Sequence, residues 1–345
     1  MKIVYAGIRN ENYNPRRRES FEYRNFYLTL RAMPGVEVIE HPFGRILEVG
    51  KKIYNEELVA LVRQEKPDLF FAFMYTDELD MQALDEIKKI TTSIAWFADD
   101  YWRFFNYSRH WPSHFSHVVT TYAQAVAWYQ ASGHKNVILS QWACNTADYK
   151  PLDLRQDIDM SFVGQRKSGR EKVLDALQAA QIHVSRYGFG FPNGKISHEK
   201  MLEVFSRSKI SLNLADRASL WEPQVLARLV ARKSISRVVP DFHLLDNFRA
   251  LQHYPTLHIH ARPFELSGCG AFVLSTYVPG IENYYAPDRE MVFYKTPEEL
   301  IEKARYYLDH SEEREKIARA GYERTRAEHT YEKRFAEVFE RIGVR

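Results

Sequence analysis

The sequence predicts an α/β protein built from two doubly wound, Rossmann-like domains that face each other across a cleft. Three observations support this fold class. The chain has 345 residues, a length that suggests two domains of roughly 150 residues each. Short apolar runs alternate with amphipathic helical patterns, as in a parallel sheet covered by helices. The alternation restarts after a polar segment near residue 150, which indicates a second sheet.

The first half of the chain contains apolar runs that predict buried parallel strands. These runs lie at 2–6, 36–40, 69–74, 93–98, 118–121 and 137–140. Amphipathic patterns predict helices between them, at 56–64, 78–89 and 123–131. Together these elements predict an N-terminal Rossmann-like domain over residues 1–150.

A polar segment without periodicity, residues 145–160, predicts the linker between the domains. Further strands are expected at 161–163, 183–187, 210–214, 271–275 and 291–294. Thr296, Pro297 and Glu299 have the pattern of a helix N-cap with a capping box. Helices are expected from there to about 308, then over 312–328 and 331–342. These elements predict a C-terminal domain over residues 151–328, followed by a C-terminal segment, 329–345.

Residues 217–256 interrupt the alternation of strands and helices. The segment is rich in arginine and lysine, and "VLARLVARKSISRVV" has a basic amphipathic pattern. Two interpretations stay open. The segment is either a helical insertion that packs on its own C-terminal domain with solvated charges, or an element that binds an acceptor, a membrane or a protein partner.

Composition and charge exclude several classes of function. The 48 basic and 45 acidic residues give a net charge of +3, which predicts no general affinity for nucleic acid or membranes. Two cysteines, Cys144 and Cys269, suggest neither a disulfide framework nor a metal site, and the histidine spacing also predicts no metal. No apolar stretch approaches the ~18 residues of a membrane span, and no signal peptide is evident. A cytoplasmic location is therefore expected.

A glycine-containing loop follows the first strand predicted for the second domain. In "SFVGQRKSGRE", Gly164 and Gly169 have the glycine spacing of a P-loop, but Arg170 and Glu171 stand where lysine and a hydroxyl residue belong. The loop therefore predicts a phosphate site that works without a metal, with Arg166 and Arg170 as its basic residues. A solvated basic turn is the alternative.

A second glycine loop, "YGFGFPNG", contributes Gly188 and Gly190 after the next strand. It lacks the third glycine of a dinucleotide-binding fingerprint, because Asn193 occupies that position. A turn of this kind can still admit a nucleotide base against its backbone, although an ordinary loop is an equal alternative.

Paired carboxylates end a predicted strand of the first domain. In "SIAWFADDYW", Asp99 and Asp100 follow a buried run, so they are expected at the carboxyl edge of a parallel sheet, where α/β proteins bind ligands. They are candidates to orient an acceptor hydroxyl, to act as a base or to bind a cation. The alternative is that one of them caps the segment beginning at Tyr101.

The segment from "ARPFELSGCGAFVLS" to "YEKRF", residues 261–335, resembles the C-terminal module of bacterial GT-B glycosyltransferases. It is most similar to the CgeB-like group of glycosyl transferases family 1. "FVGQRKSGRE", "SRYGFGFPNG" and "AWFADD" also agree with that group. The resemblance is strong over 261–335, moderate over 160–214 and weak before residue 90.

The resemblance implies a metal-independent glycosyltransferase that needs no cofactor and takes its sugar from a UDP or GDP donor, with retention expected. It puts Glu265 on the ribose hydroxyls, and Arg170 and Arg262 beside the departing diphosphate. It also implies a helix start near Ser267 and Gly268 that lies against the diphosphate. The resemblance further implies that domain 1–150 is on the acceptor side and that domain 151–328 binds the nucleotide sugar. It also implies that the last helix, within 329–345, crosses back to the N-terminal domain.

One position departs from the family pattern. Leu257 stands where retaining relatives often have a second glutamate, so sugar recognition and retention are not assigned through it. The acceptor stays open among a polysaccharide, a protein, a small molecule and a modified nucleic-acid base, and no oligomeric state is indicated. Two alternatives are a sugar-nucleotide epimerase of the same fold and a non-catalytic module that binds a sugar nucleotide or a partner.

Overall fold

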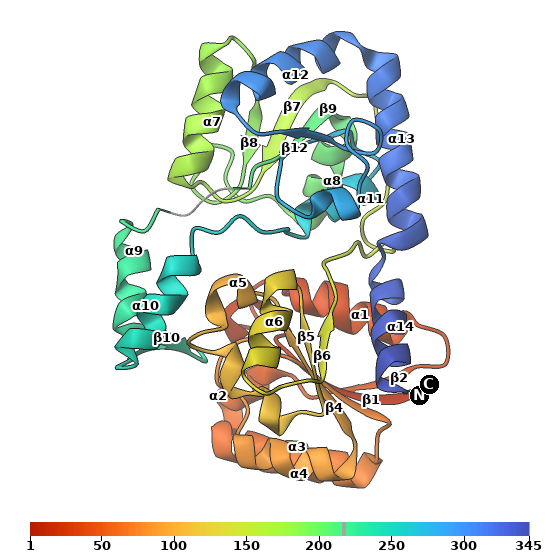
Figure 1. Ribbon diagram of the computed structural model, residues 1–345. Helices are drawn as coiled ribbons and strands as arrows, with labels where there is room; N and C mark the ends of the chain where they lie inside the picture. The colour runs from red at the N-terminus through yellow and green to blue at the C-terminus, as the bar shows by residue number, and fades with distance from the viewer. Residues whose placement is uncertain (216–218, 345) are drawn as a thin grey trace. The chain divides into compact units, whose positions relative to one another are not determined.

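The protein forms two compact units, each with its own parallel sheet (Figure 1). A computed structural model describes residues 1–215 and 219–344. Unit 1 comprises Met1–Gln141, Leu220–Tyr254 and Tyr331–Arg345, and unit 2 comprises Trp142–Ser219 and Pro255–Thr330. Among the described helices, none has both the length and the apolar character needed to cross a membrane.

The sheet of unit 1 has the strand order β2-β1-β3-β4-β5-β6, and all its neighbouring strands are parallel. Its strands are β1 (Lys2–Ala6), β2 (Glu37–Glu40), β3 (Leu69–Phe73), β4 (Thr92–Phe97), β5 (His117–Thr120) and β6 (Val137–Leu139). Each lies within one residue of its predicted bounds. The prediction succeeds for the inner strands because they are apolar runs covered on both faces; all of β3 is buried. The edge strands β2 and β6 are partly exposed.

The helices of unit 1 confirm the amphipathic patterns. They are α1 (Leu28–Ala32), α2 (Ile46–Val49), α3 (Lys51–Glu65), α4 (Met81–Ile90), α5 (Asp100–Arg103), α6 (Ala123–Ala131) and α14 (Tyr331–Ile342), with a π-helical turn at Tyr23–Tyr27 and short 3₁₀ turns at Glu11–Tyr13, Phe43–Arg45, Ser108–His110 and Pro112–His114. The last helix, α14, packs on the sheet of this unit. The ring of Phe335 lies 5.9 Å from that of Phe71 and 6.1 Å from that of Trp96.

The basic segment differs from its prediction. Of its two interpretations, the helical insertion that packs on the C-terminal domain is wrong, because the contacts of Leu220–Tyr254 place the segment in unit 1. The second interpretation, an element that binds an acceptor, a membrane or a partner, stays a prediction. It contains α9 (Pro223–Leu226), a 3₁₀ turn (Ala227–Leu229), the antiparallel hairpin β10 (Ala231–Ser234) and β11 (Arg237–Pro240), and α10 (Leu244–His253). The ion pair of Arg109 with Asp246, at 2.8 Å, helps to hold α10. Arg217 lies outside the described residues.

The sheet of unit 2 has the order β13-β12-β9-β7-β8 and is also parallel. Its strands are β7 (Ile158–Val163), β8 (Ser185–Tyr187), β9 (Ser208–Asn213), β12 (Val273–Thr276) and β13 (Val292–Tyr294), and its helices are α7 (Ser168–Ala179), α8 (His198–Arg207), α11 (Arg262–Gly268), α12 (Pro297–Asp309) and α13 (Ser311–Glu328), with a 3₁₀ turn at Ile281–Asn283. The side chain of Thr296 caps α12, as predicted, by accepting from the N–H of Glu299.

Both sheets reverse their strand order, and the reversal marks where ligands are expected. In unit 1 the reversal lies between β1 and β3, and in unit 2 it lies between β7 and β9. Ligands of open parallel sheets bind beyond the carboxyl ends of the strands at such points. The loops after β1, β3, β7 and β9 therefore border the expected ligand sites, and the loops after β4 and β8 follow beside them at the same sheet edges.

Candidate functional site

Arg170 lies at the reversal point of the unit 2 sheet. It belongs to the first turn of α7 and donates from Nε to the carbonyl oxygen of Leu214, just beyond β9, at 3.1 Å. Its Nη1 donates to the carbonyl oxygen of Gln165, in the loop after β7, at 2.9 Å. Arg170 therefore joins the carboxyl ends of β7 and β9, the edge where its sequence pattern predicts a phosphate.

The glycines of the two predicted loops let those loops pack backbone to backbone. A Cβ atom on Gly188, whose φ is +129°, would lie 1.9 Å from the carbonyl oxygen of Gly164. A Cβ atom on Gly190 would lie 2.9 Å from Cβ of Arg166. Arg166 itself forms an ion pair with Glu171 at 2.5 Å. Loop packing thus explains why these positions need glycine, and nucleotide contacts at these loops stay a prediction.

The predicted helix start near Ser267 and Gly268 is wrong. The helix α11 begins at Arg262, and Ser267 and Gly268 form its carboxyl-terminal end. Both residues are buried, and a Cβ atom on Gly268 would lie 2.2 Å from Sγ of Cys144. The small residues therefore allow the segment around Cys144 to pack closely, rather than exposing backbone N–H groups to a diphosphate.

Glu265 is held by two side chains of its own unit. Its carboxylate Oε2 lies 2.8 Å from Nη1 of Arg262, one helical turn earlier, and only 3% of the residue is exposed. Burial foremost, and then the negative charge of Glu265, raise the pKa of Tyr149, whose hydroxyl also hydrogen-bonds to Glu265. The guanidinium of Arg262 packs on the ring of Phe205 at 5.3 Å. The predicted pair Arg262 and Glu265 is thus fixed in place.

Two histidines before α11 lie close to the cations at the start of α7. The rings of His258 and His260 lie 4.0 Å apart. Burial foremost, and then the positive charges of His258, Arg170 and Lys167, hold the pKa of His260 well below its usual value. The segment before α11 and the start of α7 therefore share one electropositive neighbourhood. Sequence reasoning missed this role of His258, His260 and Lys167, because nothing local shows that two distant segments meet.

The predicted residues of unit 1 divide into one buried and one accessible carboxylate. Asp100 is fully buried and accepts a hydrogen bond from the hydroxyl of Tyr129 at 3.0 Å. Burial raises its pKa to about 6, although hydrogen bonds from Ser108, Thr120 and Tyr129 oppose the rise. Asp100 has no exposed surface and, unlike Asp99, does not line the pocket at this sheet edge, so its assignment as a catalytic residue is corrected to a structural one.

Asp99 lies at the N-cap position of α5, but its side chain makes no capping hydrogen bond. It lines a pocket of about 240 Å³ at the carboxyl edge of the unit 1 sheet, together with Tyr75, Trp102, Arg103, Arg228 and Lys233. Within residues 1–215 and 219–344, the Asp99 carboxylate has no hydrogen-bond or ion-pair partner. The predicted role of Asp99 toward an acceptor thus has a pocket in which to act.

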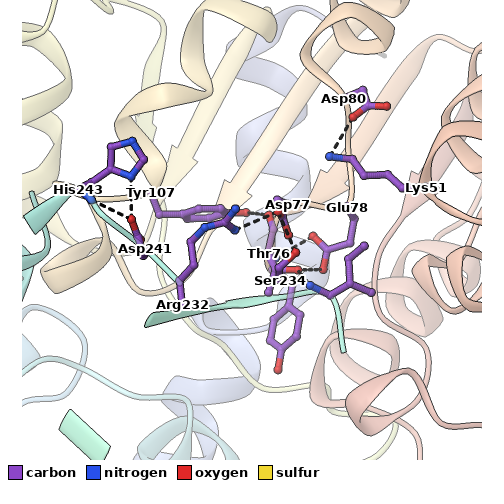
Figure 2. A network of polar contacts seen from close by, with 12 residues as sticks. Lys51, Thr76, Asp77, Glu78, Asp80, Tyr107, Arg232, Ser234, Asp241 and His243 are labelled. Atoms are coloured by element: carbon purple, nitrogen blue, oxygen red, sulfur yellow. Dashed lines mark hydrogen bonds and ion pairs between the residues drawn. The ribbon is translucent and has the colours of Figure 1, made fainter. Parts of the chain in front are cut away.

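The hairpin β10–β11 completes one wall of this pocket, and Figure 2 shows how it is held. The backbone N–H of Ile235 donates to Oγ1 of Thr76 at 3.0 Å. Ser234 and Arg232 both bind Oδ2 of Asp77, at 3.0 and 2.9 Å. The hairpin is therefore held in place by the side chains of Thr76 and Asp77 in the loop after β3.

A buried carboxylate stabilises that loop from inside. Glu78 accepts from the backbone N–H and the hydroxyl of Thr76, at 2.7 and 2.6 Å, and from the hydroxyl of Tyr13. Burial raises the pKa of Glu78, and these hydrogen bonds act against the rise. Thr76 also accepts a hydrogen bond from the hairpin, so it joins the hairpin to the buried Glu78. In the part of the chain that the structure describes, no cluster of His, Cys, Asp or Glu is suited to hold a metal ion.

Comparisons with known proteins give the family. Residues 166–340 match the family model described as glycosyl transferase-like, a range that covers slightly more than half of the chain. No match was found among curated protein sequences.

Solved structures share the fold over nearly the whole chain. Sucrose-phosphate synthase from Thermosynechococcus elongatus has a TM-score of 0.61 at 10% identity, with 99% of each chain covered. A glycosyltransferase from Rickettsia africae has a TM-score of 0.60 at 9% identity, covering 98% of this chain and 97% of its own. HepE from Anabaena, solved in complex with UDP, has a TM-score of 0.59 at 11% identity, covering 99% and 100%. These likenesses confirm the predicted GT-B fold, and together with the family match they show that the chain belongs to the glycosyl transferase-like family and is a glycosyltransferase.

Proposed function

We propose that the protein transfers a sugar from a nucleoside-diphosphate sugar to an acceptor hydroxyl, with the donor bound by unit 2. The observation that carries this proposal is the Glu265 carboxylate, fixed by Arg262 and Tyr149 in the unit whose sheet edge carries Arg170. Ribose hydroxyls can donate to the carboxylate, whose two oxygens have lone pairs beyond those that Arg262 and Tyr149 engage. The diphosphate would bind beside the cations Lys167 and Arg170.

The chemistry of transfer favours such a site. The bond between the sugar carbon and the diphosphate oxygen breaks, so negative charge grows on the leaving diphosphate. Fixed cations aimed at that oxygen stabilise the transition state more than the ground state. Arg170 and Arg262 are the residues proposed for this role, and we propose that they act without a metal ion.

We propose UDP as the nucleotide of the donor, with GDP as the alternative. HepE from Anabaena, which shares the fold, was solved with UDP-glucose and with UDP and glucose. The proposal that Glu265 binds ribose is the same for both nucleotides, because it does not involve the base.

On the acceptor side we propose that Asp99 orients the attacking hydroxyl. Carboxylates are ordinarily weak bases at neutral pH, which favours orientation over full proton abstraction. Without a strong base at the acceptor, we expect the anomeric configuration of the sugar to be retained. The anomeric proton coupling in an NMR spectrum of the product shows whether the configuration is retained. An inverted product would contradict a mechanism without a strong base.

The direct test of the donor site is Glu265→Gln, which keeps the shape of the side chain and removes its charge. Calorimetric titration with UDP should show an affinity about tenfold or more below that of the original chain, since hydrogen bonds to charged groups contribute about 1.5–3 kcal/mol. The exposed Glu302→Gln is the matched control and should bind UDP normally. Unchanged UDP affinity in a folded Glu265→Gln protein would remove Glu265 from the donor site.

A further inference from the structure

The pocket in unit 1 contains more positive charge than its own carboxylates compensate. Arg103, Arg228 and Lys233 all line it, and within the described residues their hydrogen bonds and ring contacts are with neutral groups. Arg103 also interacts electrostatically with Asp100, which is not a lining residue. The neighbouring Arg232 differs from these three cations, because it forms an ion pair with Asp77 at 2.9 Å.

Aromatic rings orient the two arginines. Nη2 of Arg103 donates to the carbonyl oxygen of Tyr75 at 2.8 Å, and its guanidinium carbon lies 4.0 Å from the ring centre of Tyr107. The guanidinium carbon of Arg228 lies 4.7 Å from the ring centre of Trp102 and 5.2 Å from that of Tyr254. A ring face holds a guanidinium in place while leaving its planar N–H groups available for bidentate bonds to an anion.

Lys233 adds a third charge from the hairpin. Its Nζ donates to Oδ1 of Asn12 at 3.1 Å and to the hydroxyl of Tyr75 at 2.9 Å, both neutral acceptors. Of the two lining carboxylates, Asp241 is engaged by Nδ1 of His243 at 2.7 Å. Burial acts to raise the pKa of Asp241, but hydrogen bonds from His243 and Asn247 lower it overall. Asp241 therefore stays ionised, and Asp99 and Asp241 together provide two negative charges against the three cations.

The pocket also lies where a substrate is expected. Tyr75 follows β3 and Asp99 follows β4, so both belong to the carboxyl edge of the parallel sheet. Its volume of about 240 Å³ is smaller than the ~300–1,000 Å³ of sites for drug-sized ligands, which suits a single sugar unit. The lining residues Tyr75, Trp102 and Tyr107 offer aromatic surface to a sugar ring, and Asp99 offers an acceptor to a hydroxyl.

We infer that this pocket binds the acceptor and that the acceptor is an anionic sugar, one that carries a phosphate or a carboxylate. The inference deepens the proposed function and rests on it, because a sugar in this pocket is an acceptor only if the protein transfers sugars. Arg228 and Arg103 bind the anionic group, Lys233 adds long-range attraction, and Asp99 takes a hydroxyl.

The test uses the full chain with UDP in saturating amount, so that anions do not enter the donor site. Calorimetry measures the binding of glucose 6-phosphate, glucuronate, inorganic phosphate and neutral glucose to the original chain, to Arg228→Ala and to Arg237→Ala. Arg237 is the matched control, because it lies on β11 of the same hairpin, is exposed and does not line the pocket. Melting temperatures show whether each variant is folded.

We expect at least one of the two anionic sugars to bind about tenfold or more tightly than glucose, and inorganic phosphate to bind measurably. Arg228→Ala should weaken these anions by about tenfold or more while Arg237→Ala leaves them unchanged. Tighter binding of glucose 6-phosphate than of glucuronate would identify the acceptor as a sugar phosphate. Tighter binding of glucuronate would identify it as a uronate.

Two results would overturn the inference: anionic sugars that bind no better than glucose with no phosphate binding, or anion binding that Arg228→Ala leaves intact in a folded protein. Failure of the proposed function gives another result: UDP does not bind to the original chain. Phosphate binding to the original chain and to Arg228→Ala then still tests whether the pocket binds anions.

Discussion

Asp99 and Asp100 are neighbours with opposite environments. Asp99 lines the pocket of unit 1, whereas Asp100 begins α5 and is fully buried against Tyr129. The sequence correctly predicts both at the end of a buried strand. It does not predict which one turns inward, because that depends on where the following helix begins and on the distant partners Ser108, Thr120 and Tyr129.

The burial of Asp100 predicts a pH-dependent stability. Its folded pKa of about 6 lies above the ordinary value of 3.8, so the folded state holds the proton more tightly. The stability that this proton provides is present below pH 4 and is lost as the pH rises through 6. Asp100→Asn should therefore gain stability relative to the original chain between pH 4 and 7, by up to about 3 kcal/mol.

Guanidinium unfolding at several pH values between 4 and 7 measures this difference. Asp99→Asn is the control at the neighbouring position and should change the free energy of unfolding by no more than about 0.5 kcal/mol, as surface substitutions usually do. A difference between Asp100→Asn and the original chain that stays constant with pH would contradict the buried, protonated carboxylate.

The resemblance to a known family predicts Glu265 and one of its two partners. The family pattern identifies Glu265 and Arg262, and the structure pairs them at 2.8 Å. It does not identify Tyr149, which lies in the segment predicted as a linker and reaches Glu265 only after folding. Partners that come from an irregular segment leave no periodic signal in the sequence.

At the scale of elements, α14 confirms its amphipathic pattern. Its predicted apolar positions Tyr331, Phe335, Val338 and Phe339 are buried, and Phe335 contacts the rings of Phe26, Phe71 and Trp96. Phe335→Ala should therefore leave a cavity in unit 1 and lower the free energy of unfolding by about 3–5 kcal/mol. Denaturant unfolding followed by tryptophan fluorescence measures this loss.

The exposed Glu340→Ala on the same helix is the matched control and should stay within about 0.5 kcal/mol of the original chain. If Phe335→Ala were as stable as this control, α14 would not be part of the core of unit 1.

The hairpin β10–β11 is the element that sequence reasoning missed. Its arginines and lysine follow a helical spacing, and its turn lacks the glycine or asparagine that marks most hairpins. Instead Ile235 takes a φ of +50°, a conformation that β-branched residues rarely adopt. Its N–H is bound by Thr76 of the loop after β3. A turn maintained by a distant residue is invisible to local pattern.

At the scale of the whole chain, the order of strands and helices follows from local pattern, but the membership of the units does not. Alternating apolar runs and amphipathic stretches predict both sheets within a few residues. The segments Leu220–Tyr254 and Tyr331–Arg345 join the first 141 residues through contacts across more than 100 residues of sequence. Such contacts, like those of the uncompensated cations in the pocket of unit 1, depend on tertiary structure.

The central claim is metal-independent transfer from a nucleoside-diphosphate sugar, and one measurement tests it most directly. The chain is incubated in EDTA with a panel of UDP- and GDP-sugars and with glucose 6-phosphate, and release of free nucleoside diphosphate is followed by chromatography. We predict release from at least one donor, at the same rate with and without EDTA, and a marked decrease in Glu265→Gln. No release from any donor, isomerisation of the sugar on its nucleotide, or complete loss in EDTA that manganese or magnesium restores would contradict the claim.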